Sequence, residues 1–330
     1  MNEATFIKQN SGKWKEFEKL IKKSKAIDAD KLAEIYIRIT DDLAFARTHF
    51  ENSELTPYLN NLASGIHLSI YKNKKEDSSR FLTFWKYELP KVMSGSLKYV
   101  FISFVVFSLS GAVGALSAAH DDTFVRLILG DQYVNETISN IQKGDPMAVY
   151  KQVGQTEMFL GITFNNIRVS FLVFVAGVFT SFATGYLLFM NGVMLGAFQY
   201  FFYQKGLFVT SALTIWIHGT LEISAIIIAG AAGIIMGNGL LFPGTYSRLY
   251  SFRRGAKRGL KIIIGLIPVF ILAGFLEGFV TRLTHMPDLI KISIILGSAI
   301  FIFIYFIFIP VKIRLNGNPS EDRILQSQEL

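Results

Sequence analysis

Three ionisable side chains, His218, Glu222 and Glu277, lie in stretches of sequence that are otherwise almost purely apolar. His218 and Glu222 are four residues apart, so on a helix they project from the same face, about one turn from each other. If these stretches cross a membrane, each ionisable group costs roughly 2.5–3.5 kcal/mol on insertion scales. We therefore expect all three side chains to face the protein interior and to find partners there.

Three kinds of chemistry fit these residues. A neutral histidine hydrogen-bonded to Glu222 would only join two helices, whereas a group completed by Glu277 would form an ion or proton site. The third is a metal site, because one histidine and two carboxylates supply three ligands to a divalent metal such as zinc and leave a fourth position open. The pattern is not that of the His-Glu-x-x-His metalloproteases, since Gly219 stands at the position of their glutamate. We predict no catalytic residue, and a divalent metal is the one cofactor that the pattern suggests.

A second group of polar residues flanks the apolar segments. Asn165 and Asn166 precede one segment, where they either cap a helix or reach inward to the ionisable residues, and Arg168 could extend to the outer membrane interface. Asn191, followed by Gly192, indicates a turn or helix break, or else a polar contribution to an internal site. The predicted polar centre comprises these residues with the three candidate metal ligands: Asn165, Asn166, Arg168, Asn191, His218, Glu222 and Glu277.

The composition favours a membrane protein. Of the 330 residues 51% are hydrophobic and 30 are Phe, while the charged fraction of 18% is well below the roughly 25% of ordinary globular domains. The absence of cysteine excludes disulfides, thiolate metal sites and cysteine nucleophiles. Intrinsic disorder, a secreted disulfide scaffold and a compact soluble enzyme are all disfavoured.

The first hundred residues are more polar than the rest. In residues 1–75 the apolar residues recur at helical spacing, for example at Trp14 and Phe17, which predicts a cytosolic helical head. Residues 76–97 combine aromatic side chains with lysines and predict an amphipathic helix at the membrane interface.

Residues 98–311 predict an all-α, polytopic membrane bundle with about six segments. The expected segments are 99–119, 167–190, 193–203, 207–241, 262–280 and 292–309. The segment at 193–203 is too short for an upright crossing and is expected to be short or re-entrant, so the region 193–241 is expected to be irregular. Residues 120–165 form an outer segment, and residues 312–330 form a cytosolic tail.

The charges of the loops predict the orientation. Residues 242–261 contain six Arg and Lys residues and no acid, which indicates a cytoplasmic loop, and residues 120–157 carry six acids against three bases, which indicates the outer side. Both termini are then cytoplasmic in a multi-pass bacterial inner-membrane protein. The basic loop could also bind anionic lipid headgroups, and the net charge of +8 requires no nucleic acid. Gly233 and Gly237 predict a close helix contact, within the chain or across a homodimer.

Four motifs resemble those of a known family. They are Asn165-Asn166-Ile167-Arg168, Asn191-Gly192-Val193-Met194-Leu195-Gly196, His218-Gly219-Thr220-Leu221-Glu222 and Glu277-Gly278-Phe279. In this order they resemble the stage II sporulation protein M family over roughly residues 98–311. The resemblance implies a polytopic inner-membrane protein, and it implies importance for His218, Glu222, Glu277, Asn165 and Asn166. The family's namesake acts with peptidoglycan-degrading partners during engulfment of the forespore.

The leading functional hypothesis is a non-enzymatic membrane component that organises a cell-envelope or membrane-remodelling complex. Its helical head and outer segment would be the docking surfaces for envelope proteins. The alternatives are a transporter or ion-coupled channel with a His/Glu site at mid-membrane depth, and an intramembrane metal-dependent hydrolase. The convergence of His218, Glu222 and Glu277 at one point would favour the two site hypotheses.

Overall fold

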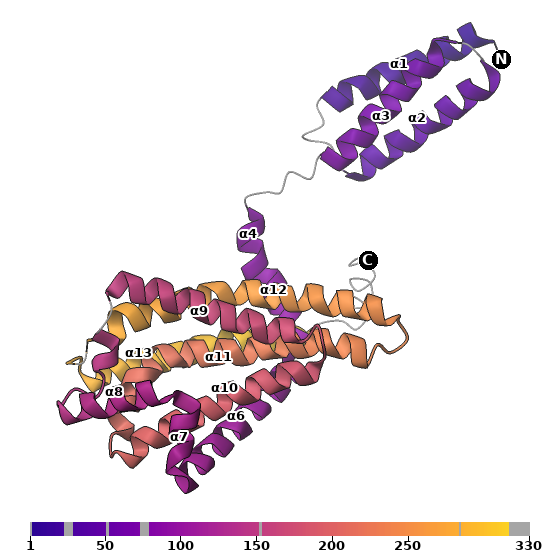
Figure 1. The fold of residues 1–330 in the computed structure, drawn as a ribbon. Coiled ribbons are helices and arrows are strands. Elements are labelled where there is room, and N and C mark those ends of the chain that lie inside the picture. The colour runs from indigo at the N-terminus through magenta and orange to yellow at the C-terminus, as the bar shows by residue number, and fades with distance from the viewer. Residues whose placement is uncertain are drawn as a thin grey trace. The chain divides into compact units, whose positions relative to one another are not determined.

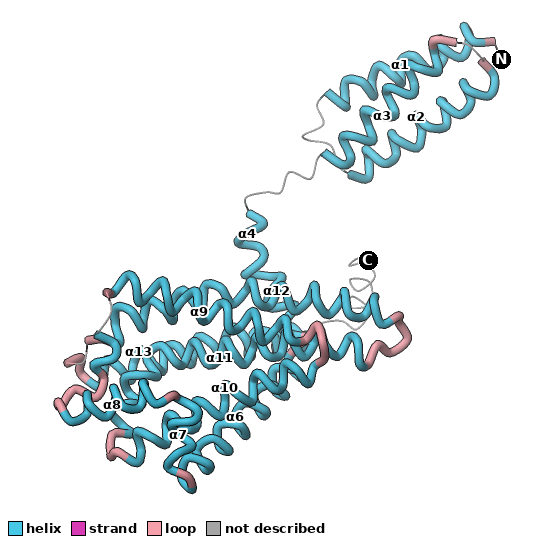
Figure 2. Tube along the Cα trace, viewed as in Figure 1, coloured by secondary structure: helices cyan, strands magenta, loops and turns pink. Residues whose placement is uncertain are grey.

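The computed structural model describes residues 2–22, 29–50, 53–72, 79–151, 154–283 and 285–316. In this part of the chain every regular element is a helix (Figure 2), which confirms the predicted all-α fold. The chain divides into two compact units, residues 1–81 and residues 82–330.

The first unit contains three helices, α1 (Glu3–Lys22), α2 (Ala29–His49) and α3 (Leu55–Lys72). Their apolar stripes meet in one core that includes Phe6, Trp14, Ile39 and Leu59. The Trp14 indole Nε1 donates a hydrogen bond of 2.7 Å to Asp42 on α2, so the one polar atom of this buried side chain is paired. This unit therefore has a hydrophobic core of its own.

The second unit contains six helices, within the described residues, that are long and apolar enough to cross a membrane (Figure 1). They are α6 (Leu97–His120), α9 (Gln155–Ala176), α10 (Ser181–Gln204), α11 (Phe208–Leu241), α12 (Arg248–Phe275) and α13 (Asp288–Phe303). A π-helical turn, η4 (Leu276–Thr281), extends α12, and η5 (Ile304–Phe308) with α14 (Ile309–Asn316) extends α13.

The helix α11 is the centre of this unit. It packs against α6, α9, α10, α12 and α13, and an unbroken run of its residues from Ala225 to Gly237 is buried. In contrast, Lys291 is the one buried residue of α13, so almost the whole surface of that helix faces outward.

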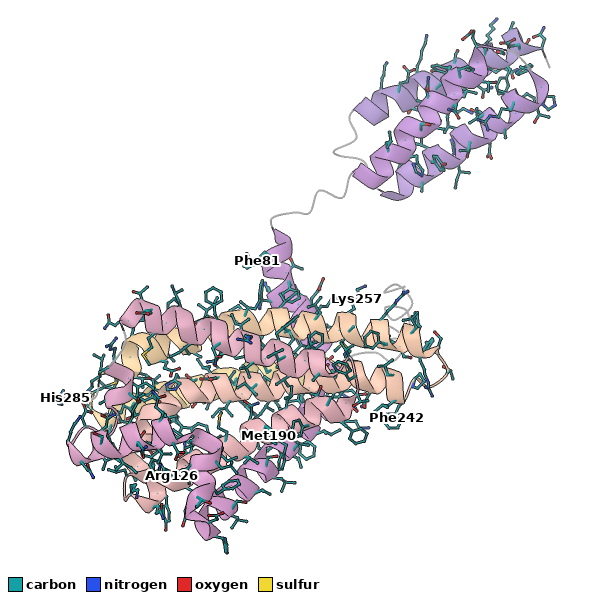
Figure 3. The ribbon with its side chains drawn as sticks, viewed as in Figure 1. Phe81, Arg126, Met190, Phe242, Lys257 and His285 are labelled. Atoms are coloured by element: carbon teal, nitrogen blue, oxygen red, sulfur yellow. The ribbon has the colours of Figure 1, made fainter. Side chains whose placement is uncertain are left out.

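Short elements pack around the long helices. The chain enters the unit through α4 (Ser79–Thr83), η2 (Phe84–Glu88) and α5 (Leu89–Ser94), and Leu89 is fully buried. Between α6 and α9 lie α7 (Asp122–Leu129), α8 (Asp131–Gln142) and the short helix η3 (Ala148–Lys151). Figure 3 shows Arg126 of α7 and His285 toward one end of the unit, and Phe242 and Lys257 toward the other. We call these the α8 end and the basic end.

The prediction of a short or re-entrant segment at 193–203 is wrong, because these residues form the second half of the 24-residue helix α10. The chain turns earlier, at residues 177–180, where the Thr180 side chain accepts a hydrogen bond from the backbone N–H of Ala183 and caps α10. Asn191 causes no break, since its amide donates to the carbonyl of Leu187 one turn before it. The expected irregularity at 193–241 is also absent, since α11 runs as one helix over Phe208–Leu241.

Glycines allow the backbones of α6 and α10 to touch. A Cβ atom on Gly192 would lie 2.6 Å from the Phe107 carbonyl oxygen, and one on Gly196 would clash with the Gly111 carbonyl oxygen. What sequence reasoning took for a turn at Asn191-Gly192 is thus a contact surface. Small residues at helix interfaces permit the close approach on which helix packing in membranes depends.

The glycines of α11 pack within the chain in the same way. A Cβ atom on Gly233 would lie 2.5 Å from the Thr184 hydroxyl oxygen and 2.7 Å from the Val173 carbonyl oxygen. One on Gly237 would clash with Ser181, at the start of α10. The contact predicted for Gly233 and Gly237 therefore joins α11 to α9 and α10, and it closes the basic end of the bundle.

We predict that Gly196→Ala lowers the thermal stability of the purified protein, with a loss of about 1–3 kcal/mol, because the added methyl overpacks two backbones that cannot separate freely. Gly185→Ala is the matched control on the same helix, since a Cβ atom there has no neighbour within 4 Å. Unfolding midpoints in mild detergent measure both. Equal midpoints for the two variants would contradict the packing described here.

Candidate metal centre and adjoining cavity

A cavity of about 500 Å³ lies at the α8 end of the second unit. Helices α9, α10 and α11 supply most of its lining, and residues of α7, α8 and η3 cover it. His218, Glu222 and Glu277 all line this cavity, although Glu277 is far from the other two in sequence. The structure therefore brings the three ionisable residues together.

His218 lies on α11 with 4% of its surface exposed. Its Nε2 atom is 3.6 Å from the Oε2 atom of Glu277, and its Nδ1 atom is 3.0 Å from the hydroxyl oxygen of Thr281. Both partners lie on η4. The histidine thus bridges α11 and the end of α12, and its hydrogen bond goes to Thr281 rather than to Glu222.

The hydrogen bonds of Thr281 favour one tautomer of His218. The Thr281 hydroxyl donates to the Leu276 carbonyl oxygen at 3.1 Å, five residues back along the π-helical turn. A hydroxyl has a single proton, so toward His218 the Thr281 oxygen can only accept. The Nδ1 atom of His218 then carries the proton, and the lone pair of Nε2 points toward Glu277. A metal-ligating histidine usually has this arrangement, in which the second ring nitrogen donates to a neighbouring oxygen.

The three side chains offer ligand atoms that lie within 4.8 Å of one another. Two ligands about 2 Å from a tetrahedral zinc ion lie roughly 3.3 Å apart. The separation of 3.6 Å between Nε2 of His218 and Oε2 of Glu277 is already close to that value. With Glu222 as the third ligand, these residues would hold a divalent ion and leave one position open beside the cavity.

Asn166 completes the polar wall of the cavity. It is 5% exposed and lies on α9 beside the Glu222 carboxylate. Its oxygen accepts a hydrogen bond of 3.4 Å from the Asn165 amide, and its buried Nδ2 atom faces the Glu222 carboxylate without a hydrogen bond of normal geometry. Glu222 is therefore the nearby acceptor for this buried donor.

The other residues of the predicted polar centre divide into two groups. Asn165 and Asn191 line the cavity, whereas Arg168 is exposed on α9 and does not reach it. The capping role considered for Asn165 and Asn166 is wrong, because α9 begins ten residues before Asn165, at Gln155. The first part of α9 contains polar residues such as Thr156 and Glu157, so its hydropathy did not indicate a membrane segment.

Two tyrosines from the covering elements were not predicted from the sequence. The ring of Tyr150, on η3, meets the His218 ring edge-on with centroids 5.9 Å apart, and Tyr133, on α8, also lines the cavity. Burial raises the pKa of the Tyr133 hydroxyl to about 12, and burial also raises the pKa of the Tyr150 hydroxyl well above its usual value. Both hydroxyls therefore stay protonated at neutral pH. Tyr133 and Tyr150 lie in short elements whose sequences show no periodic pattern, so no signal in the sequence placed them at this site.

Comparisons with known proteins identify the family of this chain. The family model of Stage II sporulation protein M matches residues 103–282, which is more than half of the chain and includes every residue of the metal-ligand set. A second model, Domain of unknown function (DUF8413), matches residues 4–72, the three-helix unit. No curated protein and no solved structure matches the chain. With its six apolar helices and this match, the chain is a multi-pass membrane protein that belongs to the stage II sporulation protein M family.

Proposed function

We propose that this protein is a metalloprotein of the bacterial inner membrane, in which His218, Glu222 and Glu277 hold one divalent metal ion, zinc by preference. The observation that carries the proposal is the convergence of these three side chains on one wall of an internal cavity. The ion would supply Lewis-acid chemistry to an oxygen ligand or a water molecule at its open position.

The electrostatics of the site support a bound cation. Two carboxylates face each other in an apolar bundle, and no lysine or arginine is among the described residues that line the cavity. Buried charges are paired, bind metals or lose their charge by protonation. A divalent ion would neutralise both carboxylates at once, and the neutral His218 with its Nε2 lone pair suits the same ion.

The shape of the unit supports a site that is closed toward the basic end more than a transport path. The α11 residues that line the cavity end at Ile226. Beyond this point Gly230, Gly233 and Gly237 pack directly against α6, α9 and α10. A channel through the bundle would have to separate these contacts, so we favour ligand binding at the site over transport.

A role in a cell-envelope complex is a second candidate, and the two roles are compatible. It is favoured by the separate three-helix unit, which has its own core and its own family match. In this proposal the head and the elements α7, α8 and η3 are the surfaces that bind envelope proteins. The basic loop at 242–261 supports a topology in which the head and both termini are cytoplasmic and α8 is on the outer side.

We predict that the purified protein binds about one equivalent of zinc. Glu222→Gln should weaken this binding by at least about 10–100-fold, which is the effect of losing a residue that only supports a metal ligand. The amide keeps the shape of the carboxylate but removes its charge. Glu157→Gln, at an exposed carboxylate on α9, is the control. Elemental analysis and competition with a zinc chelator measure the affinities. Equal affinity in both variants, or no metal in the wild type, would refute the proposed metal centre.

We predict that Thr281→Val weakens zinc binding about 10–100-fold without unfolding the protein, because His218 loses the acceptor for its Nδ1 proton. Thr214→Val is matched to it, since the Thr214 hydroxyl is also buried but donates only to the Thr210 carbonyl of its own helix. The same chelator competition applies. A zinc affinity that falls equally in both variants would show a general packing effect instead.

The chain contains no cysteine, so single cysteines can be introduced as labelling sites. We predict that two such variants are labelled from opposite sides of the membrane. In intact cells, Glu136→Cys on α8 should react with a membrane-impermeant maleimide, and Tyr246→Cys in the basic loop should react only after the membrane is opened. Both side chains are exposed in the structure. The reverse pattern would invert the proposed topology.

A further inference from the structure

The walls of the cavity differ in chemical character. His218, Glu222, Glu277 and Asn166 gather the ionisable and amide groups on one side, and Asn191 of α10 is a further polar lining residue. Most of the remaining lining is apolar and includes Phe107, Leu195 and Phe198. A largely apolar cavity with one cluster of ionisable groups fits a molecule that has a polar head and an apolar body.

Two residues that line the cavity are also exposed, and they indicate where a ligand could enter. Asn165 of α9 and Met194 of α10 line the cavity and are also exposed, Met194 to 47%. Both residues lie near the middle of helices that are long enough to cross a membrane. An opening at this depth faces lipid chains, while α7, α8 and η3 cover the end that is closest to water.

The polar wall is equipped for an oxygen ligand. The Nδ2 atom of Asn166, on a side chain 95% buried, is a donor that lies beside Glu222 and forms no hydrogen bond of normal geometry in the described structure. With a divalent ion present, the two carboxylates are neutralised and the open coordination position attracts an oxygen anion. The volume of about 500 Å³ lies within the range of small-molecule sites, roughly 300–1,000 Å³.

We propose that this cavity binds a membrane amphiphile with an oxygen-anion head, a carboxylate or a phosphate, and one long hydrocarbon chain. The molecule enters between α9 and α10, its head lies at the metal centre beside Asn166, and its chain lies against Leu195 and Phe198. The position of the head depends on the proposed metal function, whereas the position of the chain and the entrance do not.

The test uses the full-length protein in phosphatidylcholine nanodiscs, loaded with zinc, and palmitate carrying a photoreactive diazirine on its chain. We expect adducts on the part of α10 that contains Met194 and Phe198. Unlabelled palmitate or hexadecyl phosphate should compete, and the stronger competitor identifies the preferred head. Hexadecyltrimethylammonium, which has the same chain but no oxygen donor, should not compete.

Met194→Trp should block the entrance and reduce the α10 adducts about tenfold, the change that corresponds to 1.4 kcal/mol of binding free energy. Met190→Trp is the matched control, because Met190 lies one turn away on the same helix, 40% exposed, without lining the cavity (Figure 3). Both substitutions add the same side chain to a lipid-facing surface, so both variants should fold. Equal labelling in the two variants and the wild type would mean that the probe marks only the outer surface, and this would overturn the inference.

Zinc content, measured on the same samples, separates the two proposals. A protein that holds zinc but shows equal labelling in both tryptophan variants retains the metal centre and has no amphiphile site. A protein without zinc whose labelling still depends on Met194 has the amphiphile site but refutes the metal centre.

Discussion

The requirement to compensate two carboxylates inside an apolar bundle governs the architecture of this protein. Glu222 and Glu277 lie on different helices, and each would be costly alone at this depth. Their approach is stable only with protons or a cation between them, and His218 lies between Glu277 and Thr281, which contact its Nε2 and Nδ1 atoms. The π-helical turn matters here because it carries both Glu277 and Thr281. Packing of α11, α12 and α9 around this point thus brings the ionisable groups together.

Glycine packing divides the bundle into two parts with different properties. At the basic end, Gly233 and Gly237 bring the backbone of α11 against α9 and α10, so this end is nearly solid. Toward the α8 end the side chains of α9 and α10 stand farther apart and leave the cavity. Close packing at one end gives the three helices the rigidity to maintain an open site at the other, because the helices cannot shift freely at their contacts.

The all-α membrane fold and the three ionisable site residues could be predicted from the sequence. Charged residues are so rare in the apolar region that His218, Glu222 and Glu277 stood out, and helical spacing placed two of them on one face. The boundary between α9 and α10 was missed, because the turn between them contains the apolar residues Val178 and Phe179 and therefore shows no break in hydropathy. Tyr150 and Thr281 were missed as site residues, since their positions depend on how distant elements meet, which no local pattern encodes.

The outward-facing helix α13 has a different consequence. Because Lys291 is its one buried residue, the surrounding hydrocarbon is the main solvent for its side chains. If one apolar residue replaces another on its outer face, for instance at Leu296 or Ile300, the solvation of the helix changes little. Apolar substitutions on α13 are therefore expected to change the fold little, whereas the run of buried residues in α11 leaves little room for a change of side-chain size.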